Sequence, residues 1–285
     1  LLNRINPLDV LLWAFRRNEN DVVNLYNRLS SIMQLATGGN MLNFGYWDDK
    51  DTLAIMAQNR LCDIIGKLAE LDTAKLLLDV GSGLSSPAIK WASLYPNIEV
   101  SCVNTNYAQL QTARNILKEK TLHYPIYEVN STSTMLPFVK NSTDRIIALE
   151  SAQHFKPFKH FVFESNRVLK KNGILTFAIP VTTKDYNLKN LGILIFTWSS
   201  EHYSNDFIIK ATSEKFHIVE KMEIGSYVFE PLANYYIKNR KKLQQMISKQ
   251  YPTYVEKILF RSILKMKSMS RKKLIDYLLI KCLKI

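Results

Sequence analysis

The segment at residues 76–92, LLLDVGSGLSSPAIKWA, constrains the fold of this chain more than any other stretch. Three leucines lead toward Gly81 and Gly83, and Ser86 and Pro87 open an amphipathic run. Glycine lets the backbone turn tightly and brings N–H groups close to a ligand, and a helix N-terminus adds further donors. Ser86 is suited to cap that helix, and Pro87 suits its first turn. The pattern predicts a buried strand and a helix joined either by a ligand-binding loop or by an ordinary turn.

The residues around the two glycines indicate the kind of ligand. Dinucleotide-binding loops use G-x-G-x-x-G, whose third glycine allows close packing of the helix. Here Ser85 and Ser86 follow Leu84, so the third glycine is absent. Asp79 stands before the loop, where it would repel a pyrophosphate but would attract an ammonium or sulfonium group. This is the profile of S-adenosylmethionine.

From residue 76 onward, strand-like and helix-like segments alternate. Apolar runs predict strands at residues 76–80, 98–103, 126–129, 145–149, 173–179 and 216–223, and a closing strand in the final LIDYLLIKCLKI. Helical spacing predicts helices at residues 87–95, 107–120 and 158–169. We therefore expect an α/β fold, a doubly wound, mostly parallel seven-stranded sheet with ligands at the carboxyl ends of its strands.

The chain before residue 72 is expected to form an N-terminal helical cap. Residues 1–36 show helical spacing and residues 52–71 do so again, with an aromatic loop at 41–51 between them. The first helix is expected to present Leu8, Leu11, Leu12 and Phe15 on one face. Residues 72–285 are expected to form the core, with basic helices in its C-terminal part and the apolar segment 185–200 covering the site as a lid.

The net charge of +13 is concentrated in the last fifth of the chain, where fourteen Lys and Arg residues after position 235 stand against two acids. Residues 231–250 are expected to form an amphipathic helix with Lys238, Lys241 and Lys249 pointing outward. This surface is either a solvated face or a weak contact for an anionic membrane or an acidic partner. Nucleic acid is not expected, because no RNA-binding module is recognisable.

Composition excludes several other classes of protein. The three cysteines are odd in number and far apart, which predicts a reducing compartment without a disulfide framework. The His and Cys residues form no short-spaced cluster, so a structural metal site is not expected. No apolar run reaches the roughly 18 residues that span a bilayer. We therefore expect a cytoplasmic protein without a metal cofactor.

Six motifs in order carry a resemblance to a known family. They are N-F-G-Y-W (43–47), L-D-V-G-S-G (78–83), V-N-T-N-Y-A-Q (103–109), M-L-P-F (135–138), T-D-R-I-I-A-L-E-S-A-Q-H-F (143–155) and R-V-L-K-K-N-G (167–173). Together they resemble the class I S-adenosylmethionine-dependent methyltransferases over roughly residues 25–285. The resemblance is closest to the small-molecule branch, with its sugar, sterol, tocopherol and polyketide methyltransferases, and it implies S-adenosylmethionine as the cofactor.

The resemblance assigns the methionine end of the cofactor to two segments. Asp79, Gly81 and Gly83 correspond to the loop that wraps the methionine part. Phe44, Tyr46 and Trp47, in the aromatic loop, would fold over the sulfonium, because aromatic faces attract cations, or wall the acceptor pocket. The other interpretation of these rings is a hydrophobic anchor for the N-terminal helices.

The adenosine contacts implied by the resemblance depart from the family pattern. Asn104 stands where the family usually has an acid that binds the ribose, with Thr105 and Gln109 as further polar contacts. Thr132 stands where an acid often binds the adenine amino group, and the Ser133 backbone can serve the ring. Both acids are absent, which leaves these contacts open.

The motif after the fourth predicted strand supplies the catalytic candidate. Glu150 corresponds to a position that lines the cofactor cleft, or else it is a surface acid at a strand end. His154 inherits the role of a general base that faces the acceptor. Histidine suits this role because its ordinary pKa of about 6.5 leaves it able to take a proton at neutral pH, and such catalysis contributes roughly 10²–10⁴-fold.

The resemblance implies transfer of a methyl group to a small, apolar or aromatic acceptor, with O-methylation as the first choice. C-methylation of a lipid-like acceptor, methylation of RNA or protein, and a cofactor-binding protein without catalysis are the alternatives. The two missing acids motivate the last of these. An N-P-P-Y-type signature for a flipped base is absent, which weakens the case for RNA.

Overall fold

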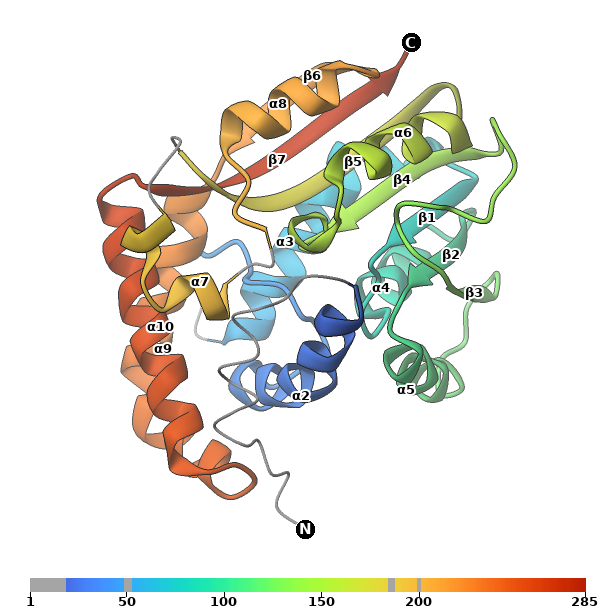
Figure 1. Cartoon of the computed structure of the whole chain (residues 1–285). Coiled ribbons are helices and arrows are strands. Elements are labelled where there is room, and N and C mark those ends of the chain that lie inside the picture. The colour runs from blue at the N-terminus through green and yellow to red at the C-terminus, as the bar shows by residue number, and fades with distance from the viewer. Residues whose placement is uncertain (1–18, 49–52, 184–187, 199–200) are drawn as a thin grey trace.

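The computed structural model describes residues 19–48, 53–183, 188–198 and 201–285. Its centre is a seven-stranded sheet with the order β3-β2-β1-β4-β5-β7-β6 (Figure 1). The pairs among β1 to β5 are parallel, whereas β7 runs antiparallel to both β5 and β6. The predicted fold class, a doubly wound and mostly parallel α/β sheet, is confirmed.

The strands are β1 (Leu76–Val80), β2 (Glu99–Asn104), β3 (Ile126–Asn130), β4 (Thr143–Leu149), β5 (Leu169–Thr182), β6 (Phe216–Glu223) and β7 (Ile275–Lys284). The helices are α2 (Glu19–Thr37), α3 (Ala54–Leu68), α4 (Ser86–Leu94), α5 (Tyr107–Leu117), α6 (Phe158–Val168), α7 (Leu194–Thr197), α8 (Asn205–Ser213), α9 (Gly225–Ser248) and α10 (Thr253–Arg271). Short 3₁₀ turns are η2 (Leu71–Thr73), η3 (Ala152–His154) and η4 (Leu188–Leu191). The strands at 76–80 and 216–223 match their predicted bounds.

The sheet buries an apolar layer on each face. In β1, Leu77 packs with residues of α3, α4 and α9, whereas Leu78 and Val80 pack with residues of α6 and α8. Successive side chains of a strand point to opposite faces, so the apolar run of β1 serves both layers. Polar residues that follow β1, β2 and β4 are left at the carboxyl edge of the sheet, where α2 lies beside them.

Helix α9 begins six residues earlier than predicted, so the predicted start at Pro231 is wrong and Pro231 lies inside the helix. Proline has no N–H, so it leaves the carbonyl four residues earlier without its helical partner. That carbonyl belongs to Tyr227, and it accepts the backbone N–H of Trp47 at 2.8 Å. The N–H of Trp47 thus replaces the donor that Pro231 lacks, and this hydrogen bond attaches the aromatic loop to α9.

Three other details differ from the sequence prediction or extend it. Ser86 does not cap α4, because it is the first helical residue; Ser85 precedes it in a left-handed conformation and makes no side-chain cap bond. Helix α8 was not predicted, and α10 is one of the expected basic C-terminal helices, whose bounds were not predicted. In the lid segment, η4 and α7 bury Leu191 and Leu194. Leu8, Leu11, Leu12 and Phe15 lie outside the described residues.

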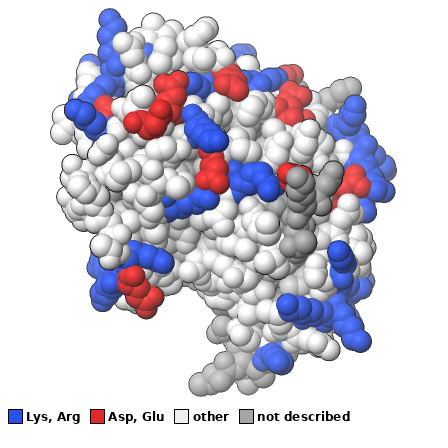
Figure 2. Space-filling model, turned by 180° about the vertical axis from the view of Figure 1, so that it is seen from behind, with Lys and Arg blue, Asp and Glu red and all other residues white. Residues whose placement is uncertain are grey.

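Helices α9 and α10 lie side by side at one edge of the molecule (Figure 1) and carry nine of the fourteen Lys and Arg residues that follow position 235. Lys238, Lys241 and Lys249 are exposed, as predicted, and Lys and Arg side chains gather at the right of Figure 2, on this edge. Arg240 instead pairs with the fully buried Glu256, with 3.0 Å between Nε and Oε1. Among the described residues, no helix is long and apolar enough to cross a membrane.

Candidate active site

The glycine loop after β1 requires glycine at Gly81 for two reasons. Its φ of +77° is rarely adopted by other residues, and a Cβ atom there would lie 2.3 Å from the Cβ of Ser151. Gly83 also has a positive φ, of +57°. Both glycines line a cavity at the carboxyl edge of the sheet, which we call the cofactor cavity. The side chain of Ser151 lies under the loop and donates to the Val80 carbonyl at 2.7 Å.

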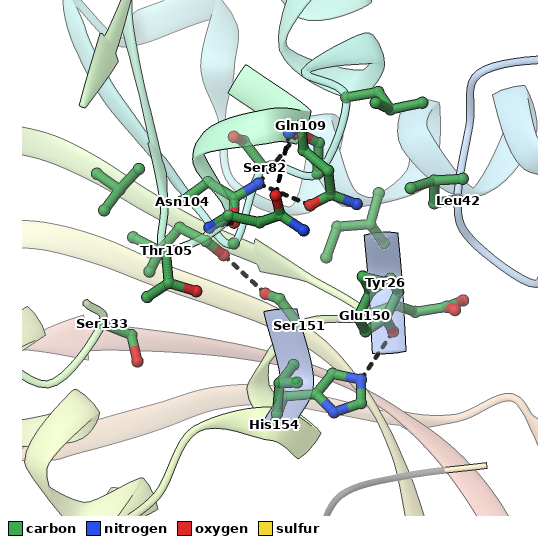
Figure 3. A pocket seen from close by; sticks show the side chains of 18 of the residues that line it. Tyr26, Leu42, Ser82, Asn104, Thr105, Gln109, Ser133, Glu150, Ser151 and His154 are labelled. Atoms are coloured by element: carbon green, nitrogen blue, oxygen red, sulfur yellow. Dashed lines mark hydrogen bonds between the residues drawn. The ribbon is translucent and has the colours of Figure 1, made fainter. Parts of the chain in front are cut away.

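Asn104, at the end of β2, organises the next wall of the cofactor cavity (Figure 3). Its Nδ2 donates to the Gly83 carbonyl at 3.1 Å and to Oε1 of Gln109 at 2.9 Å. Gln109 in turn donates to the hydroxyl of Ser30 on α2 at 2.9 Å. A carboxylate could make neither donation of Asn104. The presence of an amide rather than an acid at this position is therefore explained by the structure, because its hydrogen bonds connect the glycine loop to α5 and, through Gln109, to α2. Thr105 lines the same cavity.

The loop after β3 brings Ser131 and Ser133 to the cofactor cavity. The Ser133 hydroxyl is buried and has no hydrogen-bond partner within the described chain, so it is free for a ligand. Thr132 is not among the lining residues, and its hydroxyl bonds that of Thr134 at 2.9 Å.

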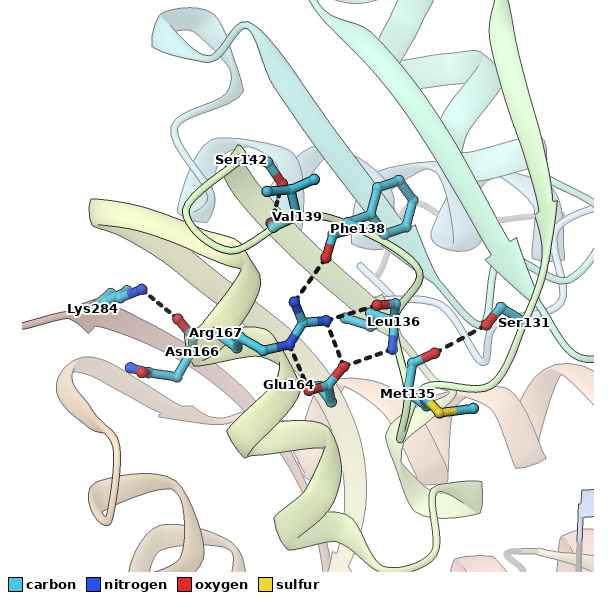
Figure 4. Close-up of polar contacts among 10 residues, drawn as sticks. All are labelled: Ser131, Met135, Leu136, Phe138, Val139, Ser142, Glu164, Asn166, Arg167 and Lys284. Atoms are coloured by element: carbon cyan, nitrogen blue, oxygen red, sulfur yellow. Dashed lines mark hydrogen bonds and ion pairs between the residues drawn. The ribbon is translucent and has the colours of Figure 1, made fainter.

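A clamp on α6 holds the segment that follows this loop (Figure 4). Arg167 donates to the carbonyls of Leu136 at 2.7 Å and Phe138 at 2.8 Å. Glu164 pairs with Arg167 and accepts the Leu136 N–H at 2.8 Å. The motifs M-L-P-F and R-V-L-K-K-N-G therefore contact each other. Through this contact α6 supports the loop that carries Ser131 and Ser133, which we call the serine loop.

Glu150 follows β4 in a left-handed conformation with φ of 51°. Its Oε1 accepts the Phe44 backbone N–H and the Tyr277 hydroxyl, each at 2.7 Å. Burial raises the pKa of this carboxyl group to about 8, against the lowering effect of both hydrogen bonds. Glu150 is therefore a buried acid at the cavity wall rather than a surface residue of a strand end.

His154 ends η3 and lines the cofactor cavity. Its Nε2 lies 2.8 Å from the hydroxyl oxygen of Tyr26 on α2, and the two rings meet edge to face at 5.2 Å (Figure 3). The sequence offered no signal for Tyr26, because this contact joins residues 128 positions apart.

Two further predicted site residues do not line the cofactor cavity. Asp79 is 2% exposed and its Oδ2 has no hydrogen-bond partner within the described chain. Burial raises the pKa of its carboxyl group to about 7. Tyr46 stacks on Tyr227 with 4.8 Å between ring centres, in line with the anchoring interpretation of the aromatic loop.

A second cavity adjoins the first, and its position among the helices was not predicted. It lies among α2, α3, α7, α9 and α10, and we call it the acceptor cavity. Its walls are mainly apolar and aromatic, with Ile32, Phe44, Leu194, Leu232 and Met266 among them. Four residues line both cavities, and they are Tyr26, Leu42, Asn43 and Glu150. Among the described residues, no group of His, Cys, Asp and Glu could hold a metal ion.

Residues 78–177 match the family model described as a methyltransferase domain. Together with the fold and the glycine-loop cavity, this match supports a class I S-adenosylmethionine-dependent methyltransferase domain within the chain. The cofactor that belongs to this class is S-adenosylmethionine. The cavity fits this cofactor, because the glycine loop lines it and the buried hydroxyl of Ser133, which also lines it, has no hydrogen-bond partner within the described chain.

Several curated relatives are similar to this chain. The 27-O-demethylrifamycin SV methyltransferase of Amycolatopsis mediterranei is 27% identical over 56% of this chain and 58% of that protein. The erythromycin 3''-O-methyltransferase of Saccharopolyspora erythraea is 23% identical over 61% of this chain and 58% of that protein. The sterol 24-C-methyltransferase of Pneumocystis carinii is 28% identical over 37% of this chain and 28% of that protein. The matches thus span little more than half the length of the first two relatives.

Solved structures share the fold over nearly the whole chain. The [4+2]-cyclase SpnF has a TM-score of 0.77 at 20% identity, covering 94% of this chain and 96% of that one. The mycolic acid cyclopropane synthase CmaA1, in complex with SAH and CTAB, has a TM-score of 0.77 at 14% identity, covering 89% of this chain and 94% of that one.

Proposed function

We propose that this protein transfers the methyl group of S-adenosylmethionine to a small acceptor, and that O-methylation is the reaction. The observation that carries the proposal is the junction of the two cavities at Tyr26, Leu42, Asn43 and Glu150. A cofactor under the glycine loop would meet an acceptor held among α2, α7, α9 and α10 across this junction. Fixing two reactants in line supplies a large part of the acceleration in such reactions.

The chain's own residues have separate tasks in this proposal. When bound, S-adenosylmethionine supplies an electrophilic methyl group. Gly81 and Ser133 hold the cofactor, and Leu42 and other apolar residues keep water from the junction. Tyr26 lines both cavities, whereas His154 lines only the cofactor cavity. We infer that the hydroxyl proton of the acceptor passes to Nε2 of His154 through the Tyr26 hydroxyl, to which the ring is already hydrogen-bonded.

O-methylation and C-methylation make different demands on this site. A hydroxyl acceptor must lose its proton, and the Tyr26–His154 pair offers a route for it, which favours O-methylation. C-methylation of a lipid-like acceptor is the second candidate, and the apolar walls of the acceptor cavity favour it. The relatives include both kinds, because rifamycin and erythromycin O-methyltransferases stand beside a sterol 24-C-methyltransferase.

We further propose that the basic face of α9 and α10 makes a weak contact with an anionic membrane surface. Lys238 and Lys241 on α9 and Lys249 just after its end are exposed, and Lys257 and Arg261 are exposed on α10. Nothing in this face lines either cavity, so it would affect where the protein resides rather than the chemistry.

Binding of S-adenosylhomocysteine tests the proposed function directly. Gly81→Arg should abolish binding in a calorimetric titration, because a side chain at this position meets Ser151 and fills the loop. Gly38→Ala is the matched control, since Gly38 has a φ of +78° but nothing within 4 Å of its Cβ position. Undiminished affinity in folded Gly81→Arg protein, or no binding by the unaltered protein, would refute the assignment.

A further inference from the structure

The acceptor cavity has apolar walls, yet several polar groups in those walls lack partners within the described chain. Gln58 and Gln153 are 1% and 3% exposed, and their Oε1 atoms accept no hydrogen bond. Their amide nitrogens are already engaged, since Gln58 donates to the carbonyls of Met41 and Asn43, and Gln153 donates to that of Glu150, all at 2.7 Å. Gln58 therefore has only its acceptor oxygen to offer, whereas Gln153 offers an acceptor oxygen and the second N–H of its amide.

Two further lining residues add unpartnered groups of the opposite kind. Nε1 of Trp198, a donor, and the hydroxyl of Tyr236 are buried without partners in the described chain. Leaving a buried polar group unpaired costs free energy, so four such groups around one cavity are unusual for a site that holds only hydrocarbon. They indicate a ligand that brings hydrogen-bonding groups of its own.

The charges of the lining exclude one kind of ligand. Glu150 is the sole acidic side chain among the described residues that line the acceptor cavity, and no Lys, Arg or His is among them. A carboxylate or phosphate would be desolvated there without a cation to pair with. The exposed cations of α9 and α10 do not line the cavity.

Resting on the proposed function, we propose that the acceptor is a multiply functional, non-anionic molecule, with an apolar skeleton and a hydroxyl or amine donor group. The donor is received by the oxygens of Gln58, Gln153 and Glu150, and oxygen atoms of the acceptor are received by Trp198 and Tyr236. Fatty acids, phosphorylated alcohols and unsubstituted hydrocarbon chains are excluded from this site.

Four probes with one skeleton test this inference, namely 4-phenylbutan-1-ol, 4-phenylbutylamine, 4-phenylbutyrate and butylbenzene. Each is titrated into the protein with and without saturating S-adenosylhomocysteine, and binding is followed by calorimetry. The alcohol and the amine should bind at least tenfold more tightly than the carboxylate and measurably more tightly than the hydrocarbon. The net charge of +13 would by itself favour the carboxylate, so this order is not an effect of the overall charge.

A substitution at Gln153 tests whether its side-chain oxygen accepts the hydrogen bond of the probe's donor group. Gln153→Leu should lower the affinity for 4-phenylbutan-1-ol about fivefold to tenfold, the usual effect of one hydrogen bond, and leave butylbenzene binding unchanged or tighter. Gln245→Leu, at an exposed position of α9, should change neither. The inference is overturned if the carboxylate or the hydrocarbon binds as tightly as the alcohol, or if neither alcohol nor amine binds. The proposed function fails separately, when S-adenosylhomocysteine itself does not bind.

Discussion

Asp79 is a buried acid whose pKa is raised by burial from 3.8 to about 7. Between these two values the folded protein keeps a proton that the unfolded chain releases, so this group's contribution to stability falls as pH rises through that window. Asp79→Asn removes this dependence. The free energy of unfolding of the variant, relative to the unaltered protein, should rise by roughly 3–4 kcal/mol between pH 4 and pH 8, since one pKa unit corresponds to about 1.4 kcal/mol.

Urea unfolding at a series of pH values measures this difference. The raised pKa of Glu150 acts in both proteins and cancels in the comparison. Asp72→Asn, at an exposed position, serves as the control and should show no such trend. A flat difference for Asp79→Asn across pH 4–8 would mean that the folded protein holds Asp79 ionised.

His154 is expected to control the rate of methyl transfer rather than the binding of the cofactor. On an acceptor found by screening for S-adenosylhomocysteine release, His154→Ala should lower kcat by roughly 10²–10⁴-fold, with S-adenosylhomocysteine affinity little changed. His160→Ala, on the exposed side of α6, should leave kcat unaltered. Turnover that survives in His154→Ala would show that positioning alone carries the reaction.

At the scale of elements, α6 supports the cofactor cavity through the clamp of Arg167 and Glu164 on the M-L-P-F segment (Figure 4). Arg167→Leu removes both donations to this segment and leaves carbonyls unpaired. Because the side chain is 36% exposed, the expected loss is modest, about 1–3 kcal/mol of unfolding free energy. Affinity for S-adenosylhomocysteine should fall as well, since the serine loop loses its support.

Arg114→Leu provides the comparison for this prediction. Arg114 pairs with Glu128 at 2.8 Å, but its side chain is 56% exposed and holds no loop of the cavity. Its loss should cost less than about 1 kcal/mol and leave cofactor affinity intact. Equal effects of the two substitutions on affinity would refute the clamp.

The sequence predicted those elements whose signal is local. The leucines of β1, the glycine turn and the order of six motifs identify the sheet and most residues of the cofactor cavity. Asn104 and Gln109 line the cavity, but their mutual hydrogen bond was not foreseen. The start of α9 was missed because Pro231 normally marks a first turn, and only the distant Trp47 makes its interior position acceptable.

The acceptor cavity could not be predicted for a related reason. Its walls come from α2, α3, α7, α9 and α10, which are brought together only by the complete fold. A partner such as Tyr26 for His154, or an orphaned oxygen such as Oε1 of Gln153, exists only once long-range packing is fixed. Neither the hydrogen-bond partner nor the unpartnered oxygen can be inferred from the periodicity of the sequence.

Over the whole molecule, α9 and α10 have two different surfaces. Their inner side lines the acceptor cavity through residues such as Leu232 and Met266, and their outer side carries the exposed lysines (Figure 2). A protein arranged in this way would place its acceptor cavity near any anionic surface that it binds. A membrane could then be both the contact and the source of an apolar acceptor.

Reversing the charge of this face tests that arrangement. The attraction is electrostatic and fades over a Debye length of about 8 Å at physiological salt, so co-sedimentation with anionic vesicles should fall steeply as salt is added. Changing Lys238, Lys241 and Lys249 together to Glu should weaken vesicle binding and leave S-adenosylhomocysteine affinity unaltered. The matched control reverses three exposed lysines elsewhere on the surface, at Lys75, Lys118 and Lys120. If both triple variants lose binding equally, only the net charge matters; if the unaltered protein does not sediment with vesicles even at low salt, this face is simply solvated.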